Sequence, residues 1–186
     1  MEISTSPLVK TYKLLEFWEL PEPPDHSKLE LIKGVLYMTP PPGGPHNEAV
    51  AEIIRNLSES IITNGYDGKL YSARAAIWID DDTYLEPDLM YVSEGLRRQM
   101  RSGHLTRADV VVQVVSPSNE VYDRTTKAET YQAMGVRELW LVYPWKQAID
   151  VRSFEAGNEA VYFIGDVLKS EVLPGLALVV ARIFSK

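Results

Sequence analysis

Two residues in apolar surroundings indicate a buried polar site. Gln113 interrupts a run of β-branched residues at 109–116 (DVVVQVVS), and such a run is typical of a strand buried on both faces. A buried amide without a hydrogen-bond partner costs roughly 1–3 kcal/mol, so a polar group must face Gln113. Asp88 is flanked by leucines and a methionine in the preceding strand-like segment. If the two strands pair in register, the carboxylate of Asp88 and the amide of Gln113 point into one pocket.

Lys127 adds a positive charge to this predicted site. Asp123 is expected to cap the helix that follows the Gln113 strand, which places Lys127 in the first turns of that helix. Backbone N–H groups at a helix start and a lysine ammonium both favour a bound phosphate. A carboxylate, an amide oxygen and a lysine together suit a hard divalent cation that holds a phosphodiester and a water. The same side chains also suit a structural hydrogen-bond network, and their spacing leaves both interpretations open.

The elements that must position these residues are predicted from hydrophobic periodicity and from turn residues. In chain order they are a short helix at 13–20, a hairpin at 29–38, a helix from about 47 to 65, strands at 69–79, 84–92 and 109–116, a helix ending at Gly135, a strand at 138–143 and three or so short strands from 148 onward. This order predicts a mixed α/β fold, with a central mixed sheet flanked by helices.

Proline and glycine positions set the expected boundaries. The segment 39–45 holds four prolines and two glycines, which predicts a stiff loop that is not helical. Asn47 is the expected N-cap of the next helix and Gly65 its terminator. Pro87 lacks a backbone N–H, so its strand is expected at a sheet edge or with a bulge.

Composition excludes several classes of protein. The chain has 186 residues, of which 45% are hydrophobic and 24% charged, as in an ordinary globular protein of one domain. It contains no cysteine and three histidines, which excludes disulfides and makes a histidine-rich zinc site unexpected. The net charge is −7, so contact with nucleic acid must rely on a local patch.

The expected location is the cytoplasm. The first residues (MEISTSP) lack a basic segment followed by an apolar one, which is the pattern of a secretory signal. No apolar run approaches the roughly 18 residues that a membrane span needs. We therefore expect no membrane association.

The joint order of several short motifs resembles the Uma-two family of putative restriction endonucleases, within the PD-(D/E)XK nuclease superfamily. The motifs are LELIKG (29–34), MTPPP (38–42) followed by His46, EPDL (86–89), VQVVSPS (112–118) leading to Asp123, Lys127 and Tyr131, and GVRELWLV (135–142). The resemblance covers roughly residues 12 to 154. It implies one restriction-endonuclease-like domain over 1–186, with a nuclease core at about 29–145, an extra N-terminal hairpin and a β-rich tail at 146–186.

The resemblance implies a magnesium-dependent nuclease site in which Mn²⁺ can substitute. Asp88 would be the metal-binding aspartate, and Lys127 would stabilise the phosphate and the attacking water. Glu30 matches an acidic position that could complete the metal shell. Gln113 departs from the family pattern, which has glutamate there. Its carbonyl oxygen can ligate a cation, but an uncharged amide cannot act as a base and should bind the ion more weakly.

Further candidates for contact with substrate occur elsewhere in the sequence. Contact with substrate is predicted for six side chains: His46, Arg97, Arg98, Arg101, Asp123 and Tyr131. The arginines belong to a basic segment that could bind phosphate, although charge runs in loops are usually only solvated. Tyr131 is also compatible with a place in the core, and His46 with a surface or capping role.

Two functions remain open from the sequence. The first is Mg²⁺-dependent endonucleolytic hydrolysis of DNA, with Asp88, Gln113 and Lys127 in the catalytic site and Asp88, Gln113 and Glu30 as metal ligands. The second, suggested by Gln113 and the acidic composition, is a catalytically inactive module that binds nucleic acid or assists assembly. A homodimer is expected, because two sites cut two strands and the β-rich tail offers strand edges that can pair.

Overall fold

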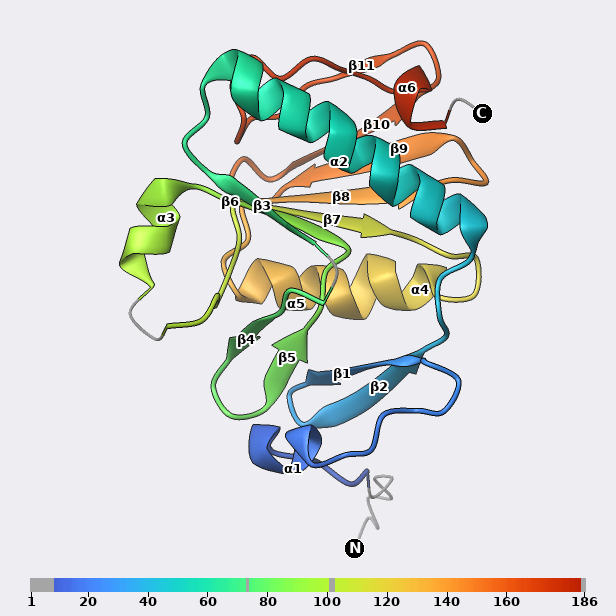
Figure 1. Cartoon of the computed structure of the whole chain (residues 1–186), viewed down its shortest axis with the longest axis vertical. Helices are drawn as coiled ribbons and strands as arrows, with labels where there is room; N and C mark the ends of the chain where they lie inside the picture. Colours follow the sequence, from blue (N-terminus) through green and yellow to red (C-terminus); the bar gives the residue numbers. More distant parts are fainter. Residues whose placement is uncertain (1–8, 73, 101–102, 185–186) are drawn as a thin grey trace, which may run out of the picture.

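The computed structural model describes residues 9–72, 74–100 and 103–184, and a six-stranded sheet forms its centre (Figure 1). The strand order is β10-β9-β8-β7-β6-β3. Neighbouring strands are antiparallel except for the parallel pair of β7 and β8. The strands are β3 (Lys69–Ser72), β6 (Leu89–Val92), β7 (Val110–Val114), β8 (Glu138–Tyr143), β9 (Ala148–Ser153) and β10 (Asn158–Phe163).

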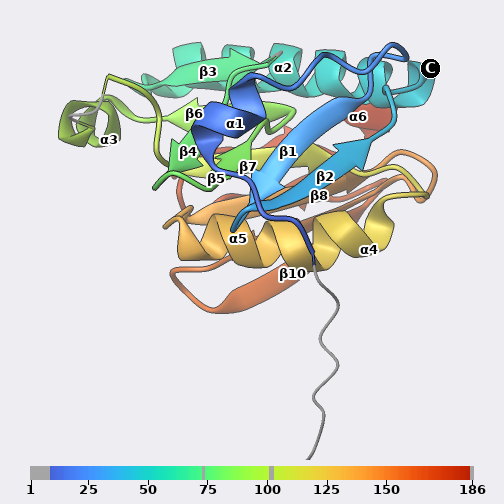
Figure 2. The ribbon, with the colours of Figure 1, turned by 90° about the horizontal axis from the view of Figure 1, so that it is seen from below.

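Helices cover both faces of this sheet. Figures 1 and 2 show α2 (Gly44–Asn64) on one face and the helical run α4 (Glu120–Tyr122), η1 (Asp123–Lys127) and α5 (Ala128–Ala133) on the other. Alternate residues of β7 follow this division, since Val112 packs in the α2 cluster and Val111 in the α5 cluster. Burial of both faces explains why the sequence of β7 is an almost continuous apolar run. The predicted mixed α/β fold with a central sheet is confirmed.

A smaller four-stranded sheet lies toward the N-terminal end (Figure 1). Its order is β2-β1-β5-β4, built from β1 (Lys28–Ile32), β2 (Val35–Thr39), β4 (Ile77–Ile79) and β5 (Thr83–Leu85). The predicted hairpin at 29–38 is therefore confirmed, with Lys33 and Gly34 in its turn. The predicted short N-terminal helix is α1 (Leu14–Trp18), whose Leu14 and Phe17 pack with Leu31 of β1.

The predicted long strands at 69–79 and 84–92 are wrong in one respect, because each is divided between the two sheets. β3 and β6 belong to the central sheet, whereas β4 and β5 belong to the smaller one. The segment 86–88 joins β5 to β6 at the division. Pro87 thus lies between strands, since it cannot donate to a ladder. The expectation of an edge strand is also wrong, because β6 pairs with both β3 and β7.

Two predicted helix starts are also corrected. α2 begins at Gly44 with Gly43 as its N-cap, so Asn47 lies inside the helix. Pro45 is compatible with the first turn, where the backbone N–H has no partner within the helix. The helical run after β7 begins at Glu120, with Asn119 at the N-cap position. Asp123 is therefore part of a π-helical turn and does not cap the helix.

The C-terminal segment contributes to the central core. It contains β11 (Val167–Leu168), β12 (Leu178–Val179) and α6 (Ala181–Phe184). Leu168, Leu178 and Ile183 are buried in the same cluster as Ile53 of α2. The remaining helix, α3 (Glu94–Gln99), follows β6. Among the described helices, none has the length and apolar character to cross a membrane.

Candidate functional site

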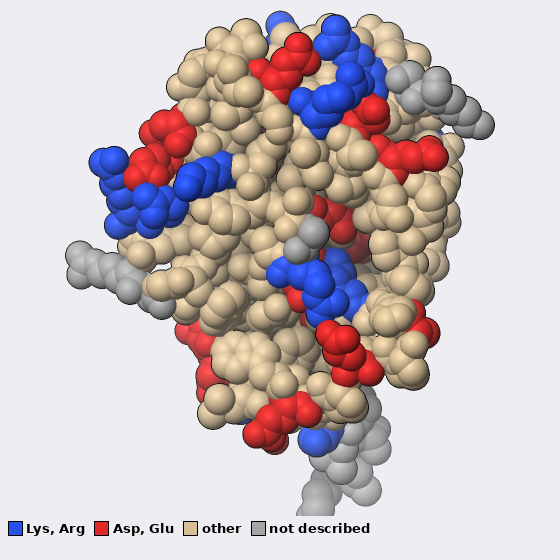
Figure 3. Space-filling view, in the orientation of Figure 1, with Lys and Arg blue, Asp and Glu red and all other residues tan. Residues whose placement is uncertain are grey.

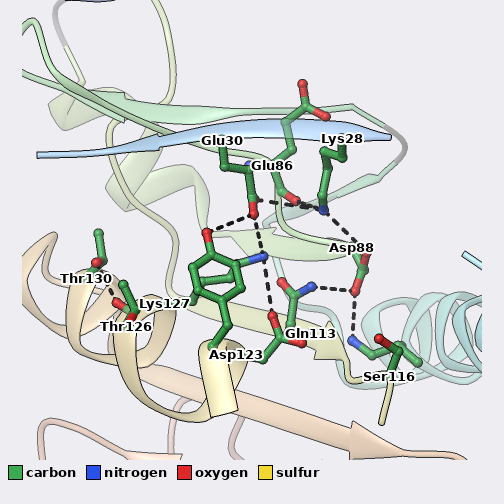
Figure 4. Close-up of polar contacts among 12 residues, drawn as sticks. Lys28, Glu30, Glu86, Asp88, Gln113, Ser116, Asp123, Thr126, Lys127 and Thr130 are labelled. Atoms are coloured by element: carbon green, nitrogen blue, oxygen red, sulfur yellow. Dashed lines mark hydrogen bonds and ion pairs between the residues drawn. The ribbon is translucent and has the colours of Figure 1, made fainter. Parts of the chain in front are cut away.

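The polar site forms where the two sheets meet the helical run of α4, η1 and α5 (Figure 4). Lys28 and Glu30 come from β1, and Asp88 from the segment before β6. Gln113 comes from β7, and Lys127 from η1. Figure 4 shows their polar groups pointing toward one another across this junction.

Asp88 and Gln113 are in contact, as their strands predict. The Nε2 of Gln113 donates to Oδ2 of Asp88 at 2.9 Å, and the backbone N–H of Val114 donates to the same oxygen at 2.7 Å. Leu89 pairs with Val112, so the next antiparallel step brings positions 88 and 113 together. On the other side of the amide, the hydroxyl of Tyr131 donates to Oε1 of Gln113 at 3.4 Å. The buried amide therefore has partners at both of its ends.

Asp88 is held as a carboxylate. Burial alone would raise its pKa. The hydrogen bond from His46 and the positive charges of Lys28 and Lys127 outweigh that effect, so the pKa lies below the usual value. A negative Asp88 is the form that can bind a cation.

Lys127 is buried within a network of carboxylates. Its side chain is 1% exposed, with Nζ at 3.1 Å from Oε2 of Glu30 and 3.8 Å from Oδ1 of Asp123. Burial by itself lowers the pKa of Lys127, but the nearby Glu30, Asp123 and Asp88 raise it above the usual value. The lysine is therefore a fixed positive charge, held by side chains rather than by a helix N-terminus.

Glu30 is the centre of this network and is completely buried. Its Oε1 accepts the backbone N–H of Glu86 at 3.1 Å, and its Oε2 accepts the hydroxyl of Tyr122 at 3.3 Å. Together with Lys127, these donors join the small sheet to the helical layer. Glu30 is thus engaged by protein donors at both oxygens.

Lys28 is a member of the site that was not predicted from the sequence. Its Nζ donates to the backbone carbonyl of Glu86 at 2.8 Å, and lies 3.8 Å from Oε1 of Glu30 and 4.0 Å from Oδ1 of Asp88. A signal was present in the sequence, because residues two apart on a strand share a face. Lys28 stands two residues before Glu30 and therefore had to point the same way.

His46 is placed beside the predicted metal-binding aspartate. Its Nε2 lies 3.3 Å from Oδ2 of Asp88. Its Nδ1 is buried and has no hydrogen-bond partner among the described residues. The helix start at Gly44 turns this side chain inward, so the surface role considered for His46 does not apply.

A cavity of about 470 Å³ opens onto these groups. Lys28, Asp88, Gln113 and Lys127 line its polar side. The prolines of 40–42 and Val50 and Ile54 of α2 also line the cavity. This volume is within the range of small-molecule sites. The lysines of the cavity can bind an anion and the carboxylate of Asp88 can bind a cation, so both kinds of group face one space.

The other predicted contacts are distributed unevenly. Asp123 lines the cavity, and burial raises its pKa to about 6, an effect that the charge of Lys127 only partly offsets. Tyr131 is fully buried and reaches the site through Gln113. Arg97 and Arg98 pair with Glu94 within α3 and do not line the cavity. Arg101 lies outside the described residues.

The donor set meets the minimum that a magnesium ion needs. Within the described part of the chain, no three His, Cys, Asp or Glu side chains form a group that could enclose a metal. Mg²⁺ requires less, because it is usually held by one or two carboxylates together with phosphates and waters. Asp88 offers the carboxylate, and the amide of Gln113 offers Oε1 if it turns over. The hydroxyl of Tyr131 can then accept from Nε2, since a hydroxyl both donates and accepts.

The fold is that of a nuclease-like α/β protein. It is similar to the crystal structure of a putative nuclease belonging to DUF820 from Anabaena variabilis ATCC 29413, with a TM-score of 0.75 and 19% identity over 94% of this chain and 98% of that one. The Uma2 family model, described as a putative restriction endonuclease, matches residues 14–181, and the chain belongs to that family. No curated protein matches the chain.

Proposed function

We propose that this protein is an endonuclease that hydrolyses DNA phosphodiester bonds with Mg²⁺, for which Mn²⁺ can substitute. The observation that carries the proposal is the contact of Asp88 with Gln113 at a cavity that two lysines also line. Membership of a family described as a putative restriction endonuclease supports it. Asp88 and Gln113 would hold the ion. Glu30 would hold the ammonium groups of Lys28 and Lys127 in place beside it.

The chemistry divides between the ion and the protein. A bound Mg²⁺ polarises a phosphoryl oxygen and makes a coordinated water a better nucleophile at neutral pH. Asp88 contributes the negative charge that attracts the ion, and its low pKa keeps that charge at neutral pH. Lys127 offsets the charge of Glu30, which would otherwise repel a phosphate. Proline and aliphatic side chains supply the apolar part of the cavity lining beside these charged groups.

Cleavage of a supercoiled plasmid tests the proposal. We expect nicking by the purified chain with Mg²⁺ or Mn²⁺, and none with EDTA. Asp88→Asn removes the charged ligand and should lower the rate at least about 100-fold, a loss of about 2.7 kcal/mol of transition-state stabilisation. Lys127→Ala should also lower the rate. The control is Asp80→Asn, an exposed aspartate in the β4–β5 turn, which should cut as the unmodified chain does.

Two results of the plasmid assay would reject the proposal. Absence of nicking with either ion, or nicking that neither Asp88→Asn nor Lys127→Ala reduces, shows that this cavity does not hydrolyse DNA. Gln113 then favours the second function, a catalytically inactive module that binds nucleic acid or assists assembly, because its neutral amide places no second carboxylate beside Asp88. Absence of DNA binding at low salt would reject the binding function as well.

A further inference from the structure

The two lysines of the cavity differ in exposure. Lys127 is 1% exposed and Lys28 is 25% exposed. Lys127 lies between Glu30 and Asp123, whereas Lys28 extends from the edge of β1 toward Asp88 (Figure 4). An incoming phosphate therefore meets Lys28 before it can reach Lys127.

The ammonium of Lys28 also has donors to spare. An ammonium group carries three N–H donors. Among the described residues, Lys28 makes one hydrogen bond, to the carbonyl of Glu86 at 2.8 Å. Its contacts with Glu30 at 3.8 Å and Asp88 at 4.0 Å are ion pairs at a distance too long for hydrogen bonds. Two N–H groups are thus held at the cavity without a close acceptor.

The charge of the site favours an ion and a phosphate together. The ion pairs join three carboxylates (Glu30, Asp88 and Asp123) to two ammonium groups (Lys28 and Lys127), which leaves one net negative charge. A divalent cation reverses this to one net positive charge, and a phosphodiester then neutralises it. Lys28 lies 4.0 Å from Oδ1 of Asp88, so it is near enough to contact a phosphate bound to the same ion.

We propose that Lys28 binds the scissile phosphate directly, and that Lys127 is a positioning residue that fixes Glu30 and through it Lys28. The inference rests on the proposed function, since it takes the phosphate of DNA as the ligand. It changes the role implied for Lys127, which then acts on the substrate through the carboxylate that it holds. Lys28 would move from its ion pair with Asp88 onto the phosphate when the divalent ion occupies Asp88.

The salt dependence of DNA binding tests the inference apart from cleavage. We would measure the anisotropy of a fluorescein-labelled 20-base-pair duplex with the full chain in Ca²⁺, from 50 to 200 mM KCl. Each lost phosphate contact lowers the slope of log K against log salt by about 0.9. Lys28→Met should lose that amount and bind about 3- to 10-fold more weakly at 50 mM KCl. Lys28→Arg should keep the slope, and the exposed Lys169→Met should match the unmodified chain.

Lys127→Met separates positioning from contact. We expect a lower thermal midpoint, because Glu30 loses a buried partner, with an unchanged salt slope for the folded protein. Adding Glu30→Gln should restore part of the midpoint, because the unpaired carboxylate is then removed. In the measurement of the salt slope, Lys28→Gln replaces Lys28→Met if Lys28→Met does not fold.

The inference is overturned if Lys28→Met, or Lys28→Gln in its place, keeps the full slope. It is also overturned if Lys127→Met lowers the slope and the neutral Lys28 variant does not. Plasmid cleavage by the unmodified chain is scored separately. A chain that binds DNA through Lys28 and never cuts would reject the proposed function and leave Lys28 only as a phosphate-binding residue. A chain that cuts while Lys28→Met keeps the full slope would support the proposed function and overturn the inference.

Discussion

Gln113 occupies a position at which a small chemical difference has a large electrostatic effect. Its Nε2 donates to Asp88, and its Oε1 accepts from Tyr131, so the neutral amide satisfies both neighbours without any ion. A carboxylate at the same position would accept from Tyr131 but would face Asp88 with a second negative charge. Gln113 therefore stabilises the ion-free protein while weakening the attraction for a cation.

Gln113→Glu should reverse this balance, so that the ion-free protein becomes less stable and the attraction for a cation becomes stronger. Two adjacent carboxylates need a cation, so we expect the free energy of unfolding in EDTA to fall by about 1–3 kcal/mol. Saturating Mg²⁺ or Mn²⁺ should recover it, because ligand binding to the folded state is stabilising. Thermal unfolding with and without the ion measures this difference, and calorimetry should show tighter cation binding. Gln132→Glu, at an exposed position in α5, should show neither effect.

An equal stability of Gln113→Glu and the unmodified chain in EDTA would contradict the argument. So would a failure of the added ion to stabilise the variant. If the variant gains plasmid cleavage that the unmodified chain lacks, position 113 is the residue that limits catalysis.

The sequence allowed some of these residues to be predicted and not others. Gln113 could be identified because β-branched neighbours on both sides imply burial, and its partner Asp88 followed from strand order. Lys28 was missed because a lysine at the start of a strand looks solvated unless its partner across the chain is known. For His46 the sequence left contact with substrate and a surface or capping role both open, since the proline-rich loop hid the true helix start at Gly44.

At the level of elements, the segment 86–88 is what brings the site together. It joins β5 of the small sheet to β6 of the central sheet. The backbone of Glu86 contacts both Lys28 and Glu30, and Asp88 contacts Gln113. An apolar run has the same appearance whether its two halves share a sheet or not, so the sequence predicted one long hairpin here. Pro87 marked the interruption, but nothing local indicated that the chain changes sheets.

The π-helical turn η1 brings Asp123 and Lys127 to the same carboxylate network, and it predicts a pH dependence of stability. Burial raises the pKa of Asp123 from 3.8 to about 6. The folded chain therefore holds this proton between about pH 4 and 6, where the unfolded chain has released it. The stabilisation that this bound proton provides is complete below the pKa of Asp123 in the unfolded chain. It is lost as the pH rises through the pKa of Asp123 in the folded chain.

Asp123→Asn removes this contribution. We expect the unfolding free energy of the unmodified chain, minus that of the variant, to decrease by up to about 3 kcal/mol from pH 4 to pH 7. Urea unfolding at half-unit pH steps measures the difference. The exposed Asp80→Asn should give a difference that does not change with pH. A constant or rising difference for Asp123→Asn would show that burial does not raise the pKa of the Asp123 carboxyl in the folded chain.

The whole molecule sets the limits of contact with DNA. The net charge is −7, and acidic and basic side chains lie next to one another over the face drawn in Figure 3. A duplex carries one negative charge per about 1.7 Å of its axis, so broad contact with such a surface would be repulsive. Under the proposed function, DNA binding must therefore concentrate on the lysines of the cavity, which makes one or two phosphate contacts decisive.

A second copy of the chain is the partner that the outer edge of the central sheet suits best. β10 is the last strand of that sheet and is exposed along nearly its whole length, with Val161 54% and Phe163 55% exposed. An unpaired edge of this kind is a template for another strand. Two β10 strands can pair antiparallel about a twofold axis, and a register centred on Val161 sets Val161 opposite its own copy and Glu159 opposite Phe163 instead of a second Glu159. Such a pairing is isologous and closed.

We therefore expect a homodimer of about 42 kDa, twice the 21.0 kDa of one chain, in sedimentation at about 50 µM. Val161→Lys places two ammonium groups together at the twofold axis, and a lysine on an edge strand discourages pairing. This variant should sediment as a monomer with an unchanged thermal midpoint. Val121→Lys is the matched control, because Val121 is also exposed, at 77%, and lies on α4 instead of on the strand that forms the proposed interface. A monomeric unmodified chain removes the dimer altogether, and a Val161→Lys variant that remains dimeric moves the interface to another surface.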